Sequence, residues 1–282
     1  MKTWFITGTS SGFGRHMTEL LLDRGDRVAA TARTPARLDD LAARHGDRLW
    51  RAALDVTDTA RLREVVACAF RDLGRIDVVV SNAGYGLIGL AEELTDAQIR
   101  RQIDTNVIAP VQLARAVTPH LRAQGGGNLL QMSSMGGHIV FPGMSLYHTS
   151  KWGIEGFFDA YALETEPFGI HTTLIEPGMV ATDFFGSADR TPSRLPAYAG
   201  TPVADFTHGG GVAPDSMPGD PRKVAEATIR IGDLPRPPRR QLLGSDAYRL
   251  VREALTARLA AVDTGRAVAV TTDRDGVAPV VA

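Results

Sequence analysis

The sequence has a single cysteine, no long apolar run and no excess of charge of either sign. One cysteine excludes an intramolecular disulfide and a metal site built from several thiolates. No apolar stretch approaches the roughly 20 residues of a membrane span, and Met1 leads directly into a strand pattern without room for a signal peptide. The 31 Lys and Arg against 32 Asp and Glu give a net charge of −1, which argues against a nucleic-acid partner. We therefore expect a cytoplasmic protein with neither a membrane nor a nucleic acid as partner.

The composition and the order of apolar runs predict one α/β domain. The chain has 282 residues, 44% of them hydrophobic, which is enough for one large core. Short apolar runs alternate with segments of helical periodicity, as is typical of a doubly wound parallel sheet. About seven strands are expected, near residues 4–6, 28–31, 49–54, 76–80, 128–132, 171–175 and 240–243. Helices are expected near residues 13–24, 35–45, 62–73, 95–124, 145–168, 221–231 and 246–262.

The periodicity fails in two places. Residues 184–221 contain six prolines and a run of three glycines, and a loop this long in a compact domain is usually a lid or binding segment. We expect this segment to be a substrate loop, and an insertion without a function is the alternative. Residues 263–282 are expected to be a C-terminal tail with weak strand propensity, which leaves residues 1–262 as the single catalytic domain.

Three glycines lie between the first expected strand and the first expected helix. Gly8-x3-Gly12-x-Gly14 is a variant of the G-x-G-x-x-G dinucleotide turn. Here the first glycine permits a tight bend, the second lets the backbone approach a pyrophosphate, and the helix N-terminus offers unpaired N–H groups to the anion. The sequence therefore predicts a dinucleotide cofactor. Hydroxyl groups that can add contacts to the cofactor are expected on Thr9, Ser10, Ser11 and Thr34.

The end of the second expected strand indicates which dinucleotide binds. An acidic residue about 20 positions after the glycine turn would grip the ribose 2′-hydroxyl of NAD, but this stretch reads Ala30-Thr31-Ala32-Arg33. An arginine pairs with a 2′-phosphate through charge-assisted hydrogen bonds. Arg33 therefore favours NADP(H), and a solvated strand end without a ligand is the alternative.

Four polar residues form the candidate catalytic group. Tyr147 and Lys151 are four residues apart near the start of an expected helix, so they share a face. A nearby ammonium lowers the pKa of a phenol toward the range useful for acid–base catalysis. Taken alone, such a pair is common by chance. Ser134, with Ser133 before it, ends the fifth expected strand at the edge where ligands of doubly wound folds bind. Asn106 lies within a helix, where an amide is unfavourable unless it caps, packs or organises a water.

Together these motifs resemble the short-chain dehydrogenase/reductases, in their single-domain Tyr-x-x-x-Lys branch. The resemblance covers residues 3–262 and implies a three-layer Rossmann fold. It rests on Thr7-Gly8-x3-Gly12-x-Gly14, Asp55-Val56-Thr57, Asn82-Ala83-Gly84, Asn106, Ser134, Tyr147-x3-Lys151 and Pro177-Gly178-x3-Thr182. Ser134 lies 13 residues before Tyr147, the interval usual in the family. Among relatives, the sequence looks most like NADP-dependent carbonyl reductases and 17β-hydroxysteroid dehydrogenases.

The resemblance implies a role for each catalytic residue. Tyr147 would be the general acid that protonates a carbonyl oxygen during reduction, and the base in the reverse direction. Ser134 would hydrogen-bond the same oxygen. Lys151 would bind the nicotinamide ribose and lower the pKa of the tyrosine, and Asn106 would anchor a water that links Lys151 to solvent.

The resemblance also implies where NADP(H) binds. Asp55 and the Val56 backbone would contact the adenine, and Pro177 to Thr182 would hold the carboxamide. The complete set of expected cofactor residues is Gly8, Thr9, Ser10, Ser11, Gly12, Phe13, Gly14, Arg33, Asp55, Val56, Asn82, Ala83, Gly84, Tyr147, Lys151, Pro177, Gly178, Val180 and Thr182.

The apolar stretch between Ser134 and Tyr147 predicts the substrate class. We expect a hydrophobic ketone or secondary alcohol as the substrate. An equal alternative is that these apolar side chains only fill the core. The expected substrate residues are Tyr85, Ser134, His138, Phe141, Met144 and Tyr147. His138 and His148 match no catalytic role in the family, so each is expected to line the pocket or lie at the surface. No His, Asp and Glu spacing indicates a metal site.

Two other functions stay open from the sequence. One is a catalytically silent NADP-binding regulatory protein on the same fold, and the other is an NAD-dependent alcohol dehydrogenase for which Arg33 is irrelevant. The family also implies a homodimer or homotetramer built on the long helices near residues 95–124 and 145–168.

Overall fold

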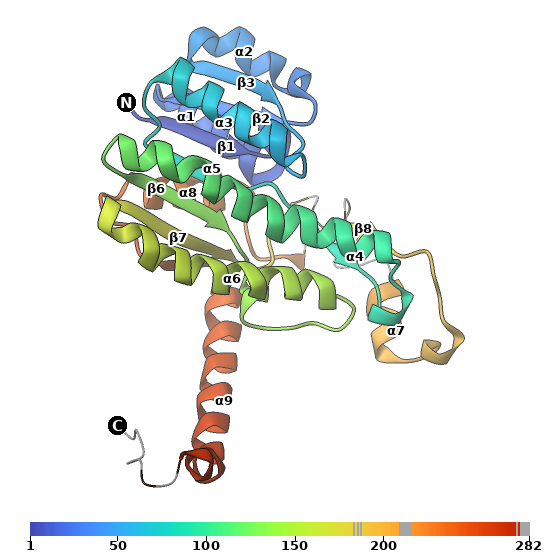
Figure 1. Cartoon of the computed structure of the whole chain (residues 1–282). Helices are drawn as coiled ribbons and strands as arrows, with labels where there is room; N and C mark the ends of the chain where they lie inside the picture. The colour runs from blue at the N-terminus through green and yellow to red at the C-terminus, as the bar shows by residue number, and fades with distance from the viewer. Residues whose placement is uncertain (183, 185, 187, 209–215, 275, 277–282) are drawn as a thin grey trace.

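The computed structural model of the chain describes residues 1–182, 184, 186, 188–208, 216–274 and 276. Within them a seven-stranded parallel sheet forms the centre, in the order β3-β2-β1-β4-β6-β7-β9 (Figure 1). The strands are β1 Thr3–Thr7, β2 Arg27–Ala32, β3 Leu49–Ala53, β4 Val78–Ser81, β6 Gly127–Met132, β7 Ile170–Pro177 and β9 Arg240–Leu243. This confirms the predicted doubly wound sheet, and the fold is a three-layer Rossmann fold.

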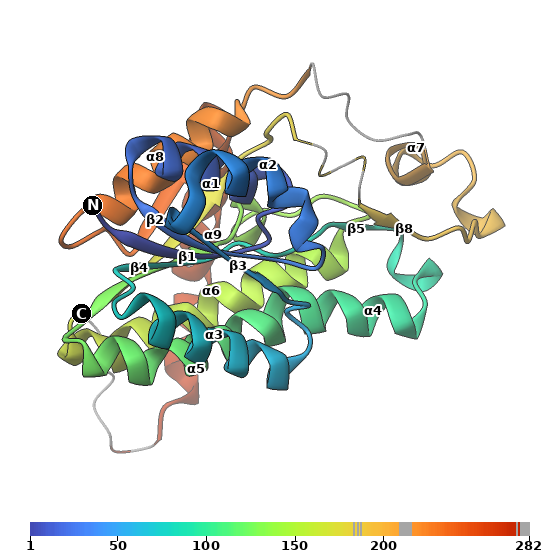
Figure 2. The ribbon, with the colours of Figure 1, turned by 90° about the horizontal axis from the view of Figure 1, so that it is seen from above.

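Helices cover both faces of the sheet (Figure 2). On one face lie α1 Gly12–Arg24, α2 Asp39–His45 and α8 Pro221–Asp233, and on the other lie α3 Thr59–Leu73, α5 Ala109–Ala123 and α6 Ser145–Thr165. Successive strand residues point to opposite faces, so Phe5 packs with α3 and α5 whereas Trp4 and Ile6 pack with α1 and α8. The short 3₁₀ turns are Pro35–Leu38, Gly46–Arg48, Ala91–Glu93, Met135–Gly137, Glu166–Phe168, Pro196–Tyr198 and Val270–Thr272.

The helix expected at residues 95–124 is interrupted. It consists of α4 Asp96–Ile103, a π-helical turn Asp104–Ile108, and α5. Thr95 and Gln98 form a capping box at its start. A π-turn changes the hydrogen-bond ladder locally and is frequent at functional sites, and here it surrounds Asn106.

The segment expected to lack periodicity contains some regular structure. β8 Asp189–Arg190 pairs with β5 Leu87–Ile88 in a two-stranded sheet, and α7 spans Pro202–His208. The Thr191 hydroxyl donates to the Glu93 carbonyl at 2.8 Å, so the loop is tied to the chain after β5. The expected glycine run at 209–211 lies outside the described residues.

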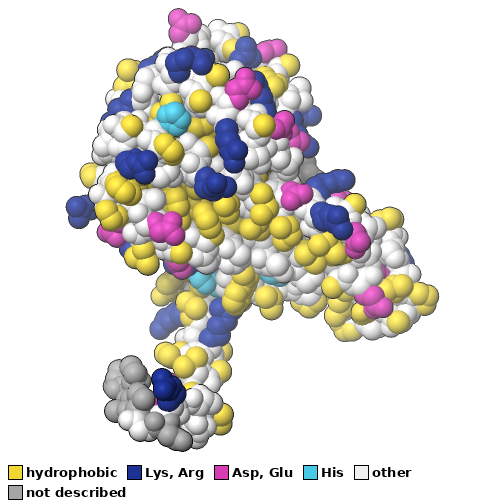
Figure 3. All heavy atoms as spheres, viewed as in Figure 1, with side chains coloured by type: hydrophobic (Ala, Val, Ile, Leu, Met, Phe, Trp, Pro, Cys, Tyr) yellow, Lys and Arg dark blue, Asp and Glu magenta, His cyan; other side chains and the backbone are white. Residues whose placement is uncertain are grey.

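The last helix is longer than the sequence indicated. α9 spans Ser245–Ala269, so the prediction of a tail with strand propensity from residue 263 is wrong for residues 263–269. The helix continues through Gly265, because one glycine costs a helix only about 1 kcal/mol. The second half of α9 projects from the body of the molecule (Figures 1 and 3). Among the described residues, no helix has both the length and the apolar character needed to cross a membrane.

Candidate active site

The predicted glycine turn connects β1 to α1. Gly8 has a φ of +73° and Gly12 a φ of +54°, in the left-handed region that favours glycine. A Cβ on Gly14 would lie 2.2 Å from the Gly8 carbonyl oxygen, so the helix starts in direct contact with the turn. The N–H groups of Gly8 and Thr9 both donate to the Thr31 carbonyl at the end of β2, at 3.0 and 3.1 Å. The turn is therefore held against two strands, with open space in front of Gly12.

The start of α1 fits the phosphates of a dinucleotide. Ser11 is the N-cap, its side chain makes no capping hydrogen bond, and the first turn carries no acidic residue. Unpaired N–H groups and the positive end of the helix dipole attract an anion here. Phe13 packs its ring against the core, so it presents only backbone to this turn.

Asn82 joins the glycine turn to the end of β4. Its Nδ2 donates to the carbonyls of Thr7 and Gly8 at 2.9 and 3.1 Å. The N–H groups of Asn82 and Ala83 both donate to the Thr7 hydroxyl at 3.0 Å. Gly84 follows and is exposed. The predicted Asn82-Ala83-Gly84 group thus lies directly beside the phosphate turn.

Arg33 and Asp55 follow β2 and β3 at the same edge of the sheet. Arg33 is exposed and makes no hydrogen bond or ion pair with any described residue, so its guanidinium is available to a ligand. The N–H and hydroxyl of Thr57 donate to Asp55 at 3.0 and 2.7 Å. These bonds lower the pKa of Asp55, and the Arg33 charge lowers it further. Val56 is partly buried against the core.

Ser134, Tyr147 and Lys151 come together as predicted. Ser134 follows β6, and the other two lie one turn apart on α6. Ser134 lies close enough to the Tyr147 phenol to lower its pKa, and the Ser134 hydroxyl oxygen accepts the Gly136 N–H at 3.0 Å. Lys151 Nζ donates to the Met132 carbonyl at 2.9 Å and lies 5.7 Å from the centroid of the Tyr147 ring.

The expected lowering of the Tyr147 pKa by Lys151 is absent in this structure. Burial raises the pKa of Tyr147 to about 12, and the Ser134 hydrogen bond only partly opposes this. Burial also lowers the pKa of Lys151 to about 8. The ammonium is engaged by Met132 and not by the phenol, so desolvation dominates both groups.

Asn106 lies in the π-turn and holds the segment after β4. Its Oδ1 accepts the Tyr85 N–H at 3.1 Å, and its Nδ2 donates to the Tyr85 carbonyl at 2.9 Å. The same Nδ2 donates to Ser150 Oγ at 3.3 Å, and Ser150 in turn donates to the Tyr147 carbonyl at 2.7 Å. The amide therefore ties the active-site helix to the Tyr85 segment.

The predicted carboxamide segment starts at the end of β7. Pro177 is its last residue, and Gly178 donates its N–H to the Leu243 carbonyl at 2.9 Å. A Cβ on Gly178 would lie 2.2 Å from Asp246 Oδ1, so only glycine fits. Asp246, which the sequence analysis missed, also accepts the Met179 N–H at 2.7 Å. Further along, Val180 bridges to Gly219 and the Thr182 hydroxyl accepts the Phe184 N–H at 3.3 Å.

One of the expected substrate residues, Met144, lies beside the phenol. Met144 packs with Tyr147 in one apolar cluster, together with Ile88 and Phe184. The rings of Phe184 and Tyr147 meet edge to face at 5.4 Å between centroids. Tyr85 has a buried hydroxyl with no hydrogen-bond partner among the described residues. Ile88 and Phe184 were missed because nothing in their local pattern indicates contact with Tyr147.

His138 and Phe141 lie outside the apolar cluster that contains Tyr147. Phe141 packs against Val251 of α9, and His138 Nε2 lies 3.1 Å from Glu176 Oε1. Neither belongs to the apolar cluster of Tyr147. The geometry therefore favours Met144 over His138 and Phe141 as a substrate contact.

His148 is buried beside Tyr147 and clamps the chain between Ser134 and Tyr147. Its Nδ1 lies 2.9 Å from the Gly136 carbonyl, and its Nε2 accepts the Phe141 N–H at 2.8 Å. These partners require a neutral ring that donates from Nδ1. Burial lowers the pKa of His148, which favours that neutral form. No local sequence pattern indicates this clamp.

A charged cluster that the sequence did not reveal lies beyond Lys151 on α6. His138, Glu155 and Glu176 come close enough to hold a metal ion. Arg240 already lies among them, with hydrogen bonds to Glu155 and, at 2.9 Å, to Glu176. Its guanidinium supplies the positive charge there, which favours a structural cluster over a metal site.

The sequence matches a known family over most of its length. The family model described as short chain dehydrogenase matches residues 2–193. The chain is 37% identical over 254 residues to the oxidoreductase BOA17 of Botryotinia fuckeliana (strain B05.10), a match that covers 90% of this chain and 92% of that protein.

Solved structures agree with the fold. A short-chain dehydrogenase from Streptomyces avermitilis has a TM-score of 0.86 and 37% identity, with 96% of this chain and 98% of that chain covered. A short-chain dehydrogenase from Sphingobium yanoikuyae, in complex with NADPH, has a TM-score of 0.73 and 25% identity, with 99% of each chain covered.

Proposed function

Because the chain belongs to the short-chain dehydrogenase family, we propose that this oxidoreductase reduces a hydrophobic ketone to a secondary alcohol with NADPH, in a reversible reaction. One observation carries the proposal. The Tyr147 phenol lies beside Ser134 and is buried in an apolar cluster at the carboxyl edge of the sheet. A proton donor in apolar surroundings suits a substrate whose carbonyl is its main polar group.

NADP(H) is the cofactor. The related Sphingobium protein binds NADPH, and the glycine turn, the start of α1 and the unpaired Arg33 offer matching groups for a pyrophosphate and a 2′-phosphate. When bound, NADPH supplies the hydride that reduces the carbonyl carbon.

The side chains of this protein handle the proton. A pKa of about 12 keeps the Tyr147 phenol protonated at neutral pH, so it donates its proton to the carbonyl oxygen. Ser134 hydrogen-bonds the same oxygen and holds it beside the phenol. The Lys151 ammonium, one helical turn away, stabilises the phenolate that proton transfer leaves.

The apolar cluster supports the substrate class. Ile88, Met144 and Phe184 surround the Tyr147 ring with side chains that offer no charge and no strong hydrogen bond. Such a lining favours aryl, alicyclic or long-chain ketones over sugars and hydroxy acids.

Replacement of one tyrosine tests the proposal. Tyr147→Phe removes the proton donor, so ketone reduction should fall by about 10²- to 10⁴-fold. NADPH binding, followed by its fluorescence, should stay within about threefold, because the phenol adds little to cofactor affinity. Tyr161→Phe is the matched control, since Tyr161 lies on the same helix and its phenol bonds to Thr118 instead.

The result separates the alternatives. Loss of turnover in Tyr147→Phe alone supports the reductase. Absence of NADPH-dependent turnover with any hydrophobic ketone, despite tight NADPH binding, contradicts it and favours the catalytically silent protein. Equal turnover in both variants would contradict the role of Tyr147.

A further inference from the structure

α9 carries an apolar stripe along one side. Tyr248, Leu255, Leu259 and Val262 are 58, 47, 63 and 69% exposed. With about 3.6 residues per turn, these four positions lie within a sector of roughly 60°. Most helices in a monomer bury such a stripe against their own core, but these four side chains remain largely exposed.

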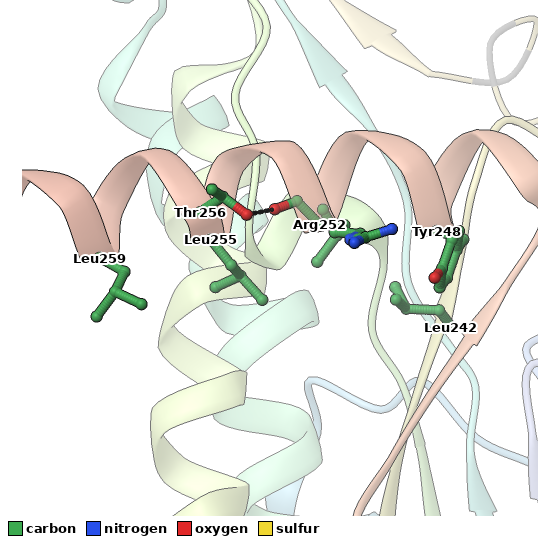
Figure 4. A pocket seen from close by; sticks show the side chains of 7 residues that line it. Leu242, Tyr248, Arg252, Leu255, Thr256 and Leu259 are labelled. Atoms are coloured by element: carbon green, nitrogen blue, oxygen red, sulfur yellow. Dashed lines mark hydrogen bonds between the residues drawn. The ribbon is translucent and has the colours of Figure 1, made fainter.

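The stripe borders a groove. Leu242 of β9 and Val251, Leu255 and Leu259 of α9 line a groove of about 320 Å³, and Figure 4 shows Leu242, Tyr248, Leu255 and Leu259 on one side of the helix. β9 is also the last strand of the sheet, so its outer edge is unpaired among the described residues. An exposed apolar groove and an unpaired strand edge are both typical of a surface that binds another protein.

Two opposite charges flank the stripe symmetrically. Arg252 and Asp263 lie on the same flank, and the side chain of neither has a hydrogen bond or ion pair among the described residues. In contrast, Arg249 and Glu253 on the polar side of α9 pair with each other at 3.2 Å. The midpoint between Arg252 and Asp263 falls within one residue of the midpoint between Leu255 and Leu259.

This pattern is complementary to itself. When two copies of such a helix lie antiparallel about a two-fold axis, side chains on one flank face the same flank of the other copy. When the pairing is centred on Leu255 and Leu259, Arg252 of each copy lies opposite Asp263 of the other copy, so two equivalent contacts form. It also places Tyr248 near Arg266 of the other copy, a cation–π arrangement.

We propose that α9 is a homodimerisation helix, which pairs antiparallel with α9 of a second copy through Tyr248, Leu255, Leu259 and Val262. Arg252 and Asp263 set the register by forming two equivalent ion pairs across the axis. The inference is independent of the proposed reductase activity. It also differs from an interface on α5 and α6, because the residues that decide it all lie on α9.

The first test measures the mass of the full-length protein in solution by sedimentation. The unmodified chain should be a dimer, or a dimer of dimers, at micromolar concentration. Leu255→Glu/Leu259→Glu should lower that mass twofold, because four carboxylates would meet at the centre of the pair. Arg249→Asp, a charge reversal on the polar side, should leave the mass unchanged, and circular dichroism checks that each variant is folded.

The second test exchanges the charges. Arg252→Asp and Asp263→Arg should each weaken self-association by about tenfold, since two like-charge contacts replace two ion pairs. Mixing the two variants in equal amounts should restore the dimer, because every flanking contact in the mixed pair is again between opposite charges. A helix merely damaged by mutation would not recover on mixing.

Three outcomes would overturn the proposal. They are a monomeric chain at tens of micromolar, an oligomer whose mass the Leu255→Glu/Leu259→Glu variant leaves unchanged, and charge variants that do not associate when mixed. The second would place the interface on another surface, such as α5 and α6.

Discussion

Lys151 and Glu155 are both buried and lie one turn apart on α6, yet their surroundings differ. Lys151 has one hydrogen bond, to the Met132 carbonyl, and burial lowers its pKa to about 8. Glu155 accepts the Ser133 hydroxyl and pairs with Arg240, which also bonds to Glu176 and Asp159.

The difference separates a reactive group from a supporting one. A buried charge with few partners has a shifted pKa and can still gain a bond from a ligand. A buried charge with a full set of partners instead holds the elements that carry those partners. Here Arg240 of β9 joins β7 and α6, so the second cluster braces the helix whose first turns carry the reactive groups.

The largest expected effect comes from Lys151→Met. It removes the ammonium near Tyr147, so kcat for reduction should fall on the order of 10²- to 10⁴-fold. Thermal stability should stay the same or rise, because an incompletely paired buried charge is lost. Lys223→Met, on the exposed start of α8, is the control for both measurements. A large loss of stability in Lys151→Met would break the comparison.

Arg240→Met should show the opposite pattern. It leaves Glu155 and Glu176 buried without their cation, so the free energy of unfolding should fall by about 3–5 kcal/mol. Turnover per folded molecule should change far less than in Lys151→Met. Arg239→Met is the control, because Arg239 pairs with Glu166 at the surface, where loss of an ion pair costs about 1 kcal/mol or less. Urea titration measures the free energy of unfolding of both variants. Equal losses of stability in Arg240→Met and Arg239→Met would contradict the bracing role.

Replacement of His148 tests whether a neutral buried group also braces the site. His148→Phe leaves the Gly136 carbonyl and the Phe141 N–H unpaired, so stability should fall by about 2–3 kcal/mol. Because the clamped chain leads to Met144, KM for the ketone should rise more than kcat falls. His148→Asn retains a donor for Gly136 and should recover part of both losses. A change in kcat alone would argue for a direct chemical role instead.

The smallest effect is expected at the surface, where Arg33 is a charge without a partner. Arg33→Ala should weaken NADPH binding by about ten- to a hundredfold, through loss of a charge-assisted contact with the 2′-phosphate. NADH binding should be unchanged. Arg37→Ala, four residues further and also exposed, is the control. An unchanged preference between the two cofactors would favour the NAD-dependent alternative.

The sequence predicted the parts of the site that depend on local spacing. Gly8, Gly12 and Gly14 belong to one turn, and Tyr147 and Lys151 to one helix, so their relations follow from neighbouring positions alone. The doubly wound parallel sheet followed from the regular alternation of strands and helices, whereas the strand order came from the structure.

Other parts depend on contacts between distant segments. Arg240 meets Glu155 across 85 positions, and Phe184 reaches Tyr147 from a loop without periodicity. No local pattern specifies such a contact, because burial and tertiary packing decide it. The pKa of Tyr147 differed from expectation for the same reason. The Met132 carbonyl that accepts the Lys151 hydrogen bond belongs to β6, whereas Lys151 lies on α6.

The order of the strands also bears on how the chain folds during its synthesis. β3-β2-β1-β4 uses only residues 3–81, and each later strand, β6, β7 and then β9, is added at the same outer edge. An N-terminal sub-sheet can therefore form while the rest is still being translated, and it then serves as the template for each strand that emerges. The edge that stays open longest is the one beside α9, so the surface available for self-association is completed last.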